Sequence, residues 1–117
     1  MDNTHLGSLV KNSDFGTIIR CEKTYTANMT VSINGYVLGP LAFIAVVLGF
    51  TATAPTGEAL AKLSIPPSAD TILNGVVKSE TGVSSGNYIK IDTNGYVYQT
   101  ATSFCKEVII CGMYPIK

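Results

Sequence analysis

Hydrophobic and polar residues alternate along most of this chain in short runs, and Gly, Pro, Asn and Asp residues separate the runs. Thr, Val, Ile and Tyr dominate the runs, and these residue types favour β-strands. Alternation at every second position is typical of a strand with one buried face. The predicted strands cover approximately residues 17–24, 28–33, 36–38, 41–53, 72–78, 88–92, 96–100 and 108–114, with 60–65 as a further extended segment. We therefore expect an all-β fold, an antiparallel β-sandwich of jelly-roll type with about eight short strands.

A polar segment precedes the first predicted strand. Residues 1–16 carry few strand-forming residues, and we expect them to form an N-terminal arm. Residues 17–117 are enough for one hydrophobic core and too few for two. We expect this part to be a single β-sandwich head domain.

Residues 56–63 are compatible with either a short helix or a strand. Ala and Leu residues recur there at spacings that suit a helix, but the Pro66-Pro67 pair follows closely and would end it. Elsewhere, helical spacing is scarce. The segment is the best helix candidate in a chain that otherwise favours strands.

Two further segments are predicted to connect strands. Asn34-Gly35 is a turn dipeptide between two short apolar runs. Residues 82–86 are rich in Gly and Ser, and they lack the Lys and the following helix of a phosphate-binding loop. We expect a plain loop at this position.

The longest apolar stretch covers residues 37–50, inside a charge-free region over residues 24–57. On hydropathy it resembles a membrane span, but a spanning helix needs about 20 apolar residues, and Gly39, Pro40 and Gly49 interrupt this stretch. The segments on both sides alternate as strands do. We expect a buried strand and no membrane insertion.

The sequence Asp-Thr-Asn-Gly that begins at Asp92 predicts a tight corner between two strands. A two-residue loop would mix polar and apolar side chains on each face. A three-residue loop with Gly95 in the left-handed conformation instead pairs Ile91 with Val97. In that register Ile89, Ile91 and Val97 face the core together.

The opposite face of this corner then carries three aromatic rings interleaved with two charges. We identify this set as the candidate ligand-binding group: Tyr88, Lys90, Asp92, Tyr96 and Tyr98. An outward aromatic cluster of this kind is either a subunit interface or a surface on which a sugar stacks.

The composition of the chain limits the kinds of partner that it is expected to bind. Eight Lys and Arg balance eight Asp and Glu, so no net field attracts nucleic acid or an anionic membrane. Hydrophobic residues make up 46% of the chain and charged residues 14%, and the mean hydropathy is +0.30. With so few charges, we expect another subunit to cover some apolar surface, and no nucleic acid to bind.

Three cysteines, Cys21, Cys105 and Cys111, form an odd set in a chain long enough to build a core. This argues against the disulfide framework of a small secreted protein, and we expect reduced, buried thiols. A Cys105–Cys111 bridge is the alternative, if the two face each other across a turn. The polar start of the chain lacks the basic and apolar regions of a secretory signal, so we expect no leader peptide.

The residue types that usually carry catalysis are scattered. His5 is the only histidine and lies close to the N-terminus, so a Ser-His-Asp or Cys-His site is not expected. It also has no Cys or carboxylate at metal-ligand spacing. The carboxylates beyond the first residues are spread along the chain at Asp14, Glu22, Glu58, Asp70, Glu80, Asp92 and Glu107. We expect no enzyme, no metal and no cofactor.

Several turn motifs follow one another in a recognisable order. They are MTVSINGYV from Met29, a long apolar strand, APTG from Ala54, the strand over residues 72–77, and GNYIKIDTNGYV from Gly86. This series, over residues 28–100, resembles the distal head domains of bacteriophage tail fibres and receptor-binding proteins. The chain departs from the family at Tyr36, where Trp is usual.

The resemblance implies a homotrimeric β-sandwich at the tip of a fibre or on a baseplate, which attaches the virion to saccharide on a host cell surface. It also implies a virion protein assembled in the host cytoplasm, with the arm over residues 1–16 bound to other virion proteins. The aromatic group from Tyr88 to Tyr98 would contact the glycan, with Ser85 and Asn87 in the adjoining loop.

An alternative function is structural: a decoration protein, or a fibre or baseplate assembly protein, without receptor binding of its own. In that case the outward tyrosines form an assembly surface, and the charge-free region over residues 24–57 forms the core of the oligomer.

Overall fold

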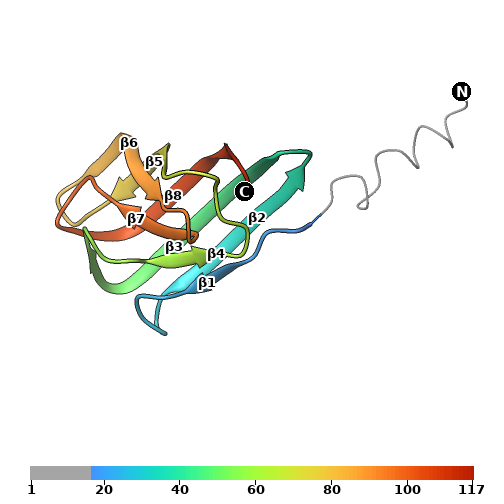
Figure 1. The fold of residues 1–117 in the computed structure, drawn as a ribbon. Helices are drawn as coiled ribbons and strands as arrows, with labels where there is room; N and C mark the ends of the chain where they lie inside the picture. The colour runs from blue at the N-terminus through green and yellow to red at the C-terminus, as the bar shows by residue number, and fades with distance from the viewer. Residues whose placement is uncertain (1–16) are drawn as a thin grey trace, which may run out of the picture.

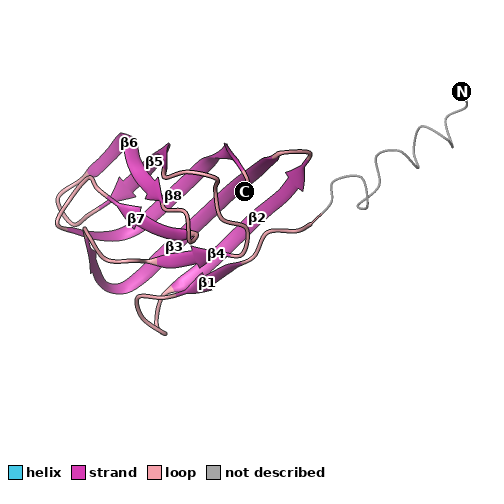
Figure 2. Cartoon of the chain, viewed as in Figure 1, coloured by secondary structure: helices cyan, strands magenta, loops and turns pink. Residues whose placement is uncertain are grey.

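The computed structural model describes residues 17–117, which form eight β-strands and no helix (Figures 1 and 2). The strands are β1 (Cys21–Lys23), β2 (Thr30–Leu38), β3 (Leu41–Pro55), β4 (Ala61–Leu63), β5 (Thr71–Lys78), β6 (Val83–Ile91), β7 (Tyr96–Gln99) and β8 (Phe104–Pro115). All pairs are antiparallel. The predicted all-β fold is therefore confirmed. The expected arm over residues 1–16 lies outside the described residues.

The strands form one sheet in the order β1-β4-β7-β6-β5-β8-β3-β2, and the sheet nearly closes on itself (Figure 1). Closure depends on the segment before β1. Its backbone bonds to β2, with Ile19 N donating to Gly35 O at 3.0 Å and Val37 N donating to Thr17 O at 3.0 Å. The chain then crosses at Arg20 to the other edge, where β1 pairs with β4. One stretch of chain thus joins both edges of the sheet.

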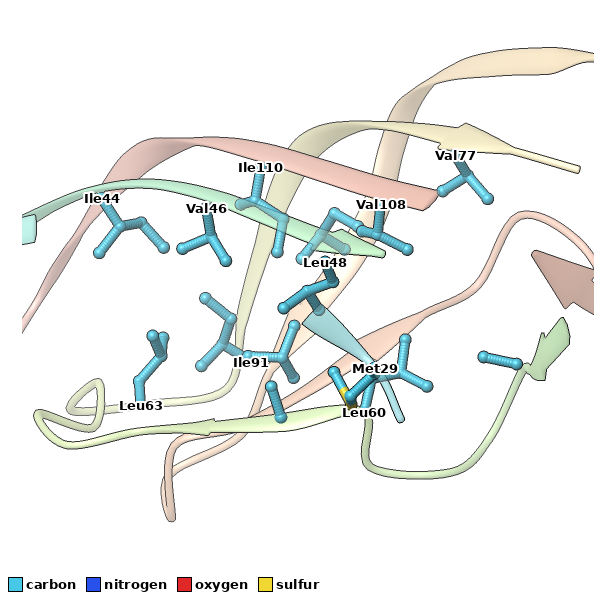
Figure 3. Packing of buried hydrophobic residues seen from close by; sticks show 14 of the residues in the cluster. Met29, Ile44, Val46, Leu48, Leu60, Leu63, Val77, Ile91, Val108 and Ile110 are labelled. Carbon is cyan, nitrogen blue, oxygen red and sulfur yellow. The ribbon is translucent and has the colours of Figure 1, made fainter. Parts of the chain in front are cut away.

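The core lies between two opposed layers of this flattened barrel (Figure 3). Ile44, Val46 and Leu48 on β3 and Val108 and Ile110 on β8 point inward from one layer. The facing side chains come from the β4, β6 and β7 side and include Leu60, Leu63, Ile89, Ile91 and Val97. All of these side chains are buried, so the predicted inward orientation of Ile89, Ile91 and Val97 is confirmed.

The predicted turn at Asn34-Gly35 is wrong, because β2 runs through both residues without interruption. The hairpin turns at Gly39-Pro40 instead, where Leu38 pairs with Leu41. Gly39 has a φ of 61°, which suits the first central position of a two-residue hairpin loop, and Pro40 needs no backbone N–H there. Gly35 packs closely against the segment before β1: a Cβ on it would lie 3.1 Å from the Cβ of Ile19, so a larger residue would require Ile19 to shift.

The apolar stretch over residues 37–50 lies in the β2–β3 hairpin, and within residues 17–117 there is no helix of the length and apolar character that a membrane span requires. The prediction of a long strand is confirmed, but its burial is one-sided. Inward residues such as Ala42 and Val46 are buried, whereas Ala45 and Val47 between them are exposed on the outer face.

The predicted loop over residues 82–86 is wrong. Residues 83–86 are part of β6 and pair with Gly75–Lys78 of β5, so the connecting loop is confined to residues 79–82. Pairing with β5 overrides the weak local preference of these residues. For residues 56–63 the sequence left helix and strand open, and the structure confirms the strand: there is no helix, and the last three residues form β4.

The cysteines are three free thiols, and the alternative Cys105–Cys111 bridge is wrong. Both residues lie on β8, six positions apart, which at about 3.3 Å per residue is far beyond the reach of a disulfide. They also face opposite sides. The alternation of β8 breaks between Cys105 and Val108, which are three positions apart and both buried, opposite the register shift between Gly49 and Ala54 on β3. Cys105 is therefore buried, whereas Cys111 is exposed. The expectation of buried thiols therefore holds for Cys105, is met only in part by Cys21, which is half-buried, and fails at Cys111.

One buried polar side chain, Gln99 at the end of β7, organises the loop that leads to β8. Its Oε1 accepts hydrogen bonds from Ala101 N at 3.0 Å and Thr102 N at 3.2 Å, and its Nε2 donates to Thr102 O at 2.6 Å. The side chain is fully buried and all of its polar atoms have partners. The loop after β7 has no neighbouring strand to bond to, so the Gln99 side chain supplies the hydrogen-bond partners of its backbone N–H and C=O groups at Ala101 and Thr102.

We expect Gln99→Leu to lower the free energy of unfolding by about 2 kcal/mol, because it leaves buried backbone groups without partners. Urea unfolding at neutral pH measures this effect. Thr100→Val is the control: Thr100 is exposed, and its hydroxyl bond to Tyr88 O is replaceable by water, so the loss should stay within about 0.5 kcal/mol. Equal losses in the two variants would contradict this role for Gln99.

Burial also predicts how stability depends on pH. It raises the pKa of Cys105 from 9.0 to about 11; burial and then Glu22 raise the pKa of Cys21 to about 11. Burial and then Cys21 raise the pKa of Tyr114, whose hydroxyl donates to Ile65 O, to about 12. Above about pH 9 the folded chain therefore holds more protons than the unfolded chain, and its stability falls as pH rises toward 11–12.

Urea unfolding in the presence of a reductant, at intervals from about pH 7 to about pH 11, measures this loss. Stability should be nearly constant up to about pH 9 and should decrease beyond it. Cys105→Val removes one of the titrating groups and should make the decrease shallower. A stability that stays constant across the alkaline range would contradict the prediction.

Candidate functional site

The corner between β6 and β7 has the three-residue loop that the sequence predicts. Asp92 N donates to Tyr96 O at 3.0 Å, and Gly95 N donates to Asp92 O at 2.9 Å. Gly95 has a φ of 90°, in the left-handed region, and Ile91 pairs with Val97. The predicted register of this corner is therefore confirmed.

Gly95 is also required by its neighbour across the sheet. A Cβ on Gly95 would lie 2.5 Å from the carbonyl oxygen of Leu63, which is a backbone atom that cannot move aside. Leu63 N donates to Gly95 O at 2.8 Å, so the corner is fixed against the end of β4. Because Leu63 and Gly95 are in contact, the side chains of β4 lie close to the β6–β7 corner.

The carboxylate of Asp92 is used inside the corner. Its Oδ1 accepts hydrogen bonds from Asn94 N at 2.9 Å and from Tyr96 N at 3.0 Å, and its Oδ2 accepts one from Tyr98 Oη at 3.3 Å. Partial burial first, and the charge of Asp92 second, raise the pKa of Tyr98 above its usual value. Tyr98 therefore stays a hydrogen-bond donor, and Asp92 holds the loop and the ring together.

The five residues of the predicted group all lie half-buried on the outer face of β6, β7 and their corner. Lys90 is paired with Tyr98 across the two strands, and its Nζ lies 3.7 Å from Asp70 Oδ2. Asp70 also accepts a hydrogen bond from Thr93 N at 3.2 Å. Tyr88 lies further along β6, beside Gly86. The register thus places the group on the outer side of β6 and β7, but Tyr88 also packs against the core, Lys90 is paired with Asp70 outside the group, and Asp92 is bonded within the corner. Ligand binding by the five residues stays a prediction.

An open cleft of about 560 Å³ lies beside this corner, and of the predicted group only Tyr96 lines it. The cleft is lined by Glu22, Lys62, Leu63, Ser64, Pro66, Thr93, Asn94, Tyr96 and Lys117. These residues come from β1, β4, the β6–β7 corner and the last residue of the chain. Strand pairing brings these lining residues together, because Glu22 pairs with Lys62 and Lys62 pairs with Tyr96 in one row across the strands.

Lys62 and Tyr96 form the centre of this row. The Lys62 ammonium lies 5.3 Å from the centroid of the Tyr96 ring, a cation–π contact that orients both side chains. Lys62 was missed at the sequence level because β4 is only three residues long and its partners are distant in the chain. A charged side chain between buried Ala61 and Leu63 was the one local signal of its outward position.

The chemistry of the cleft suits a polar, uncharged ligand with an apolar face. Hydroxyl, amide, ammonium and carboxylate groups surround one aromatic ring, so hydrogen bonds in both directions and ring stacking are possible together. Within residues 17–117, no three His, Cys, Asp or Glu side chains are close enough to hold a metal ion. His5 lies outside the described residues.

Comparisons with protein-family models, with curated proteins and with solved structures found no match for this chain. The resemblance to phage fibre head domains therefore depends on the turn motifs of the sequence alone.

We expect Asp92→Ala to lower the free energy of unfolding by about 1–2 kcal/mol, because two backbone N–H groups of the corner lose their acceptor. Asp92→Asn is the matched variant. Its side-chain carbonyl oxygen can accept both bonds, so more than half of the lost stability should return. Urea unfolding of the three proteins compares them, and an Asn variant as unstable as the Ala variant would show that the charge matters and the turn bonds do not.

Proposed function

We propose that this chain is a bacteriophage virion protein, the receptor-binding head of a tail fibre or baseplate, which attaches to saccharide on the host cell surface. The observation that carries the proposal is the cleft beside Tyr96, where one aromatic ring is surrounded by hydrogen-bonding side chains. The order of motifs in the sequence supports the phage setting, although one of them, Asn34-Gly35, lies within β2 and is not a turn.

Sugar recognition needs an apolar platform and polar groups at its edge. The C–H face of a sugar ring covers an aromatic ring, and its hydroxyls bond to nearby polar groups. In this cleft Tyr96 provides the platform. The exposed ammonium of Lys62 and the side chains of Ser64 and Asn94 lie around it as donors and acceptors.

The cleft is suited to binding more than to bond cleavage. A glycosidase places two carboxyl groups on either side of the bond that it cuts. Of the side chains that line this cleft, Glu22 alone is a carboxylate, and the Asp92 carboxylate is bonded within the corner. We therefore propose attachment without a chemical reaction.

Several copies of the head would act together in the virion. Single sugar sites bind weakly, and linked sites raise the overall affinity without any new contact. The sequence resemblance makes the assembly a homotrimer and assigns residues 1–16 to contacts with other virion proteins. Both assignments are part of the proposal.

A structural role in the virion, without receptor binding, is the second candidate. The observation in its favour is the outer surface of β3, where Ala45 and Val47 are exposed. Under this function the Tyr96 cleft would bind no saccharide, so the same experiment separates the two candidates.

A glycan array with the purified chain identifies the saccharide, and calorimetric titration then measures its affinity. We expect Tyr96→Ala to weaken binding about tenfold or more, since the loss of a stacking ring costs about 1.4 kcal/mol or more. The free energy of unfolding of the variant should change little, because Tyr96 is half-buried on the outer face.

Phe104→Ala is the control for this titration. Phe104 is also an exposed aromatic residue, 57% accessible, but it lies at the start of β8, whereas Lys117 of the cleft follows the end of that strand. Its loss should leave saccharide binding unchanged. The saccharide-binding function is rejected if no glycan binds the assembled protein, or if Tyr96→Ala binds as well as the unaltered chain.

A further inference from the structure

The outer surface of β2, β3 and β8 is uncharged over three consecutive rows of the sheet. Strand register places the side chains in the rows Tyr36–Phe43–Met113, Asn34–Ala45–Cys111 and Ser32–Val47–Ile109. We call these nine positions the neutral face. Tyr36, Val47 and Met113 are 39%, 39% and 55% exposed, so this surface presents large apolar side chains to solvent.

The neutral face is distant from the Tyr96 cleft. In the order of the sheet, β3 and β8 lie on the opposite side of the barrel from β4 and β7, with the core between them (Figure 3). A partner on the neutral face would leave the cleft open. The two surfaces therefore serve separate interactions.

Charge limits the kind of partner. Beyond the neutral face, the next row holds Lys78 and Glu107, which pair with each other at 3.2 Å. Nucleic acid, an acidic protein or an anionic lipid surface would find no cation within the face to bind. A second copy of the same face carries no charge either, so two copies meet without burying an unpaired charge.

The size of the neutral face suits the centre of a subunit interface. Three strands at about 4.8 Å spacing and three rows at about 7 Å spacing give a projected area of roughly 300 Å². A stable interface buries about 800 Å² on each partner, with an apolar centre and a polar rim. Here Thr30 and the Lys78–Glu107 pair, in the next row, lie where that rim would be.

The neutral face is not flat, and its hollow can receive a side chain from another subunit. A hollow of about 440 Å³ opens over Ala45 and Gly112, between the small residues of the middle row and the larger residues around it. Tyr36 and Phe43 form one wall as a stacked pair, with ring centroids 5.4 Å apart and an interplanar angle of 19°. An apolar side chain from another subunit, of the size of Met113 or Phe43, fits such a hollow.

Part of the sheet edge is already paired within the described chain. The second half of β2 is bonded at Gly35 and Val37 to Ile19 and Thr17, and β1 is bonded to β4. The neutral face, in contrast, presents exposed side chains on all three of its strands, at Asn34, Ala45, Val47 and Cys111.

From these observations we propose that the neutral face binds a second copy of this chain and forms the interface between subunits. The proposal does not depend on saccharide binding. It assigns the apolar outer surface of the β2–β3 hairpin and β8 to self-association, with Ala45 at its centre and Val47 in the adjoining row.

Light scattering behind size exclusion tests the proposal on the purified full chain, at loading concentrations from about 1 to about 100 μM. The expected mass is a whole-number multiple, two or more, of 12.4 kDa. Val47→Glu places an unpaired charge in the interface and should raise the dissociation constant at least a hundredfold. A single-chain mass for the unaltered protein at every concentration overturns the proposal.

Val83→Glu is the matched control, because Val83 is also an outward valine on a strand, 66% exposed, and it pairs with Lys78 on β5 outside the neutral face. This variant should keep the mass of the unaltered protein. Assembly that survives Val47→Glu, or that is lost equally in both folded variants, overturns the assignment of the face.

Cys111 gives a second measurement that needs no new charge. It is exposed in the middle row of the face, whereas Cys105 is buried. The alkylation rate of Cys111, located by mass spectrometry, should fall at least tenfold as the protein concentration rises through the assembly transition. A rate that stays the same in the monomer and the oligomer overturns the proposal even if Val47→Glu does not fold.

Discussion

Closure of the sheet is the constraint on which the rest of the structure depends. An open eight-stranded sheet would expose the backbone groups of its two edge strands, and such edges pair non-specifically with the strands of other chains. Here residues 17–23 bond to the second half of β2 and then to β4, so one short segment connects the two edges. The same closure brings the two layers of buried side chains into contact and makes a single core from a chain that contains no helix among its described residues.

Closure also divides the outside of the barrel into two chemically different surfaces. On one side β1, β4 and β7 align Glu22, Lys62 and Tyr96 in a row beside a tight corner, which gives a polar cleft. On the other side β2, β3 and β8 align uncharged side chains, with Ala45 at the centre. One surface is suited to a small polar ligand and the other to a neutral protein surface, and both can be occupied together.

The corner at Asp92 shows which features follow from local sequence. Its side chain, its glycine and the loop length all favour one geometry, so Ile91 and Val97 could be placed before the structure was known. Asn34-Gly35 shows the opposite case. The dipeptide favours a turn, but neighbouring strands hold both residues extended, and β2 continues through them. Three of the lining residues of the cleft, Glu22, Lys62 and Lys117, carried no local signal of their proximity to Tyr96.

The sequence by itself determined that this protein is all-β, where its longest strand lies, and which side chains of the β6–β7 hairpin face the core. Alternation and turn chemistry act over a few residues, and these features need nothing more. Only the tertiary structure decided which strands are neighbours, and with them the members of the cleft, the exposed outer side of β3 and the opposite orientations of Cys105 and Cys111. The physical reason is that strands pair through backbone groups, which are the same at nearly every residue, so the choice of partner is made by the packing of the whole core.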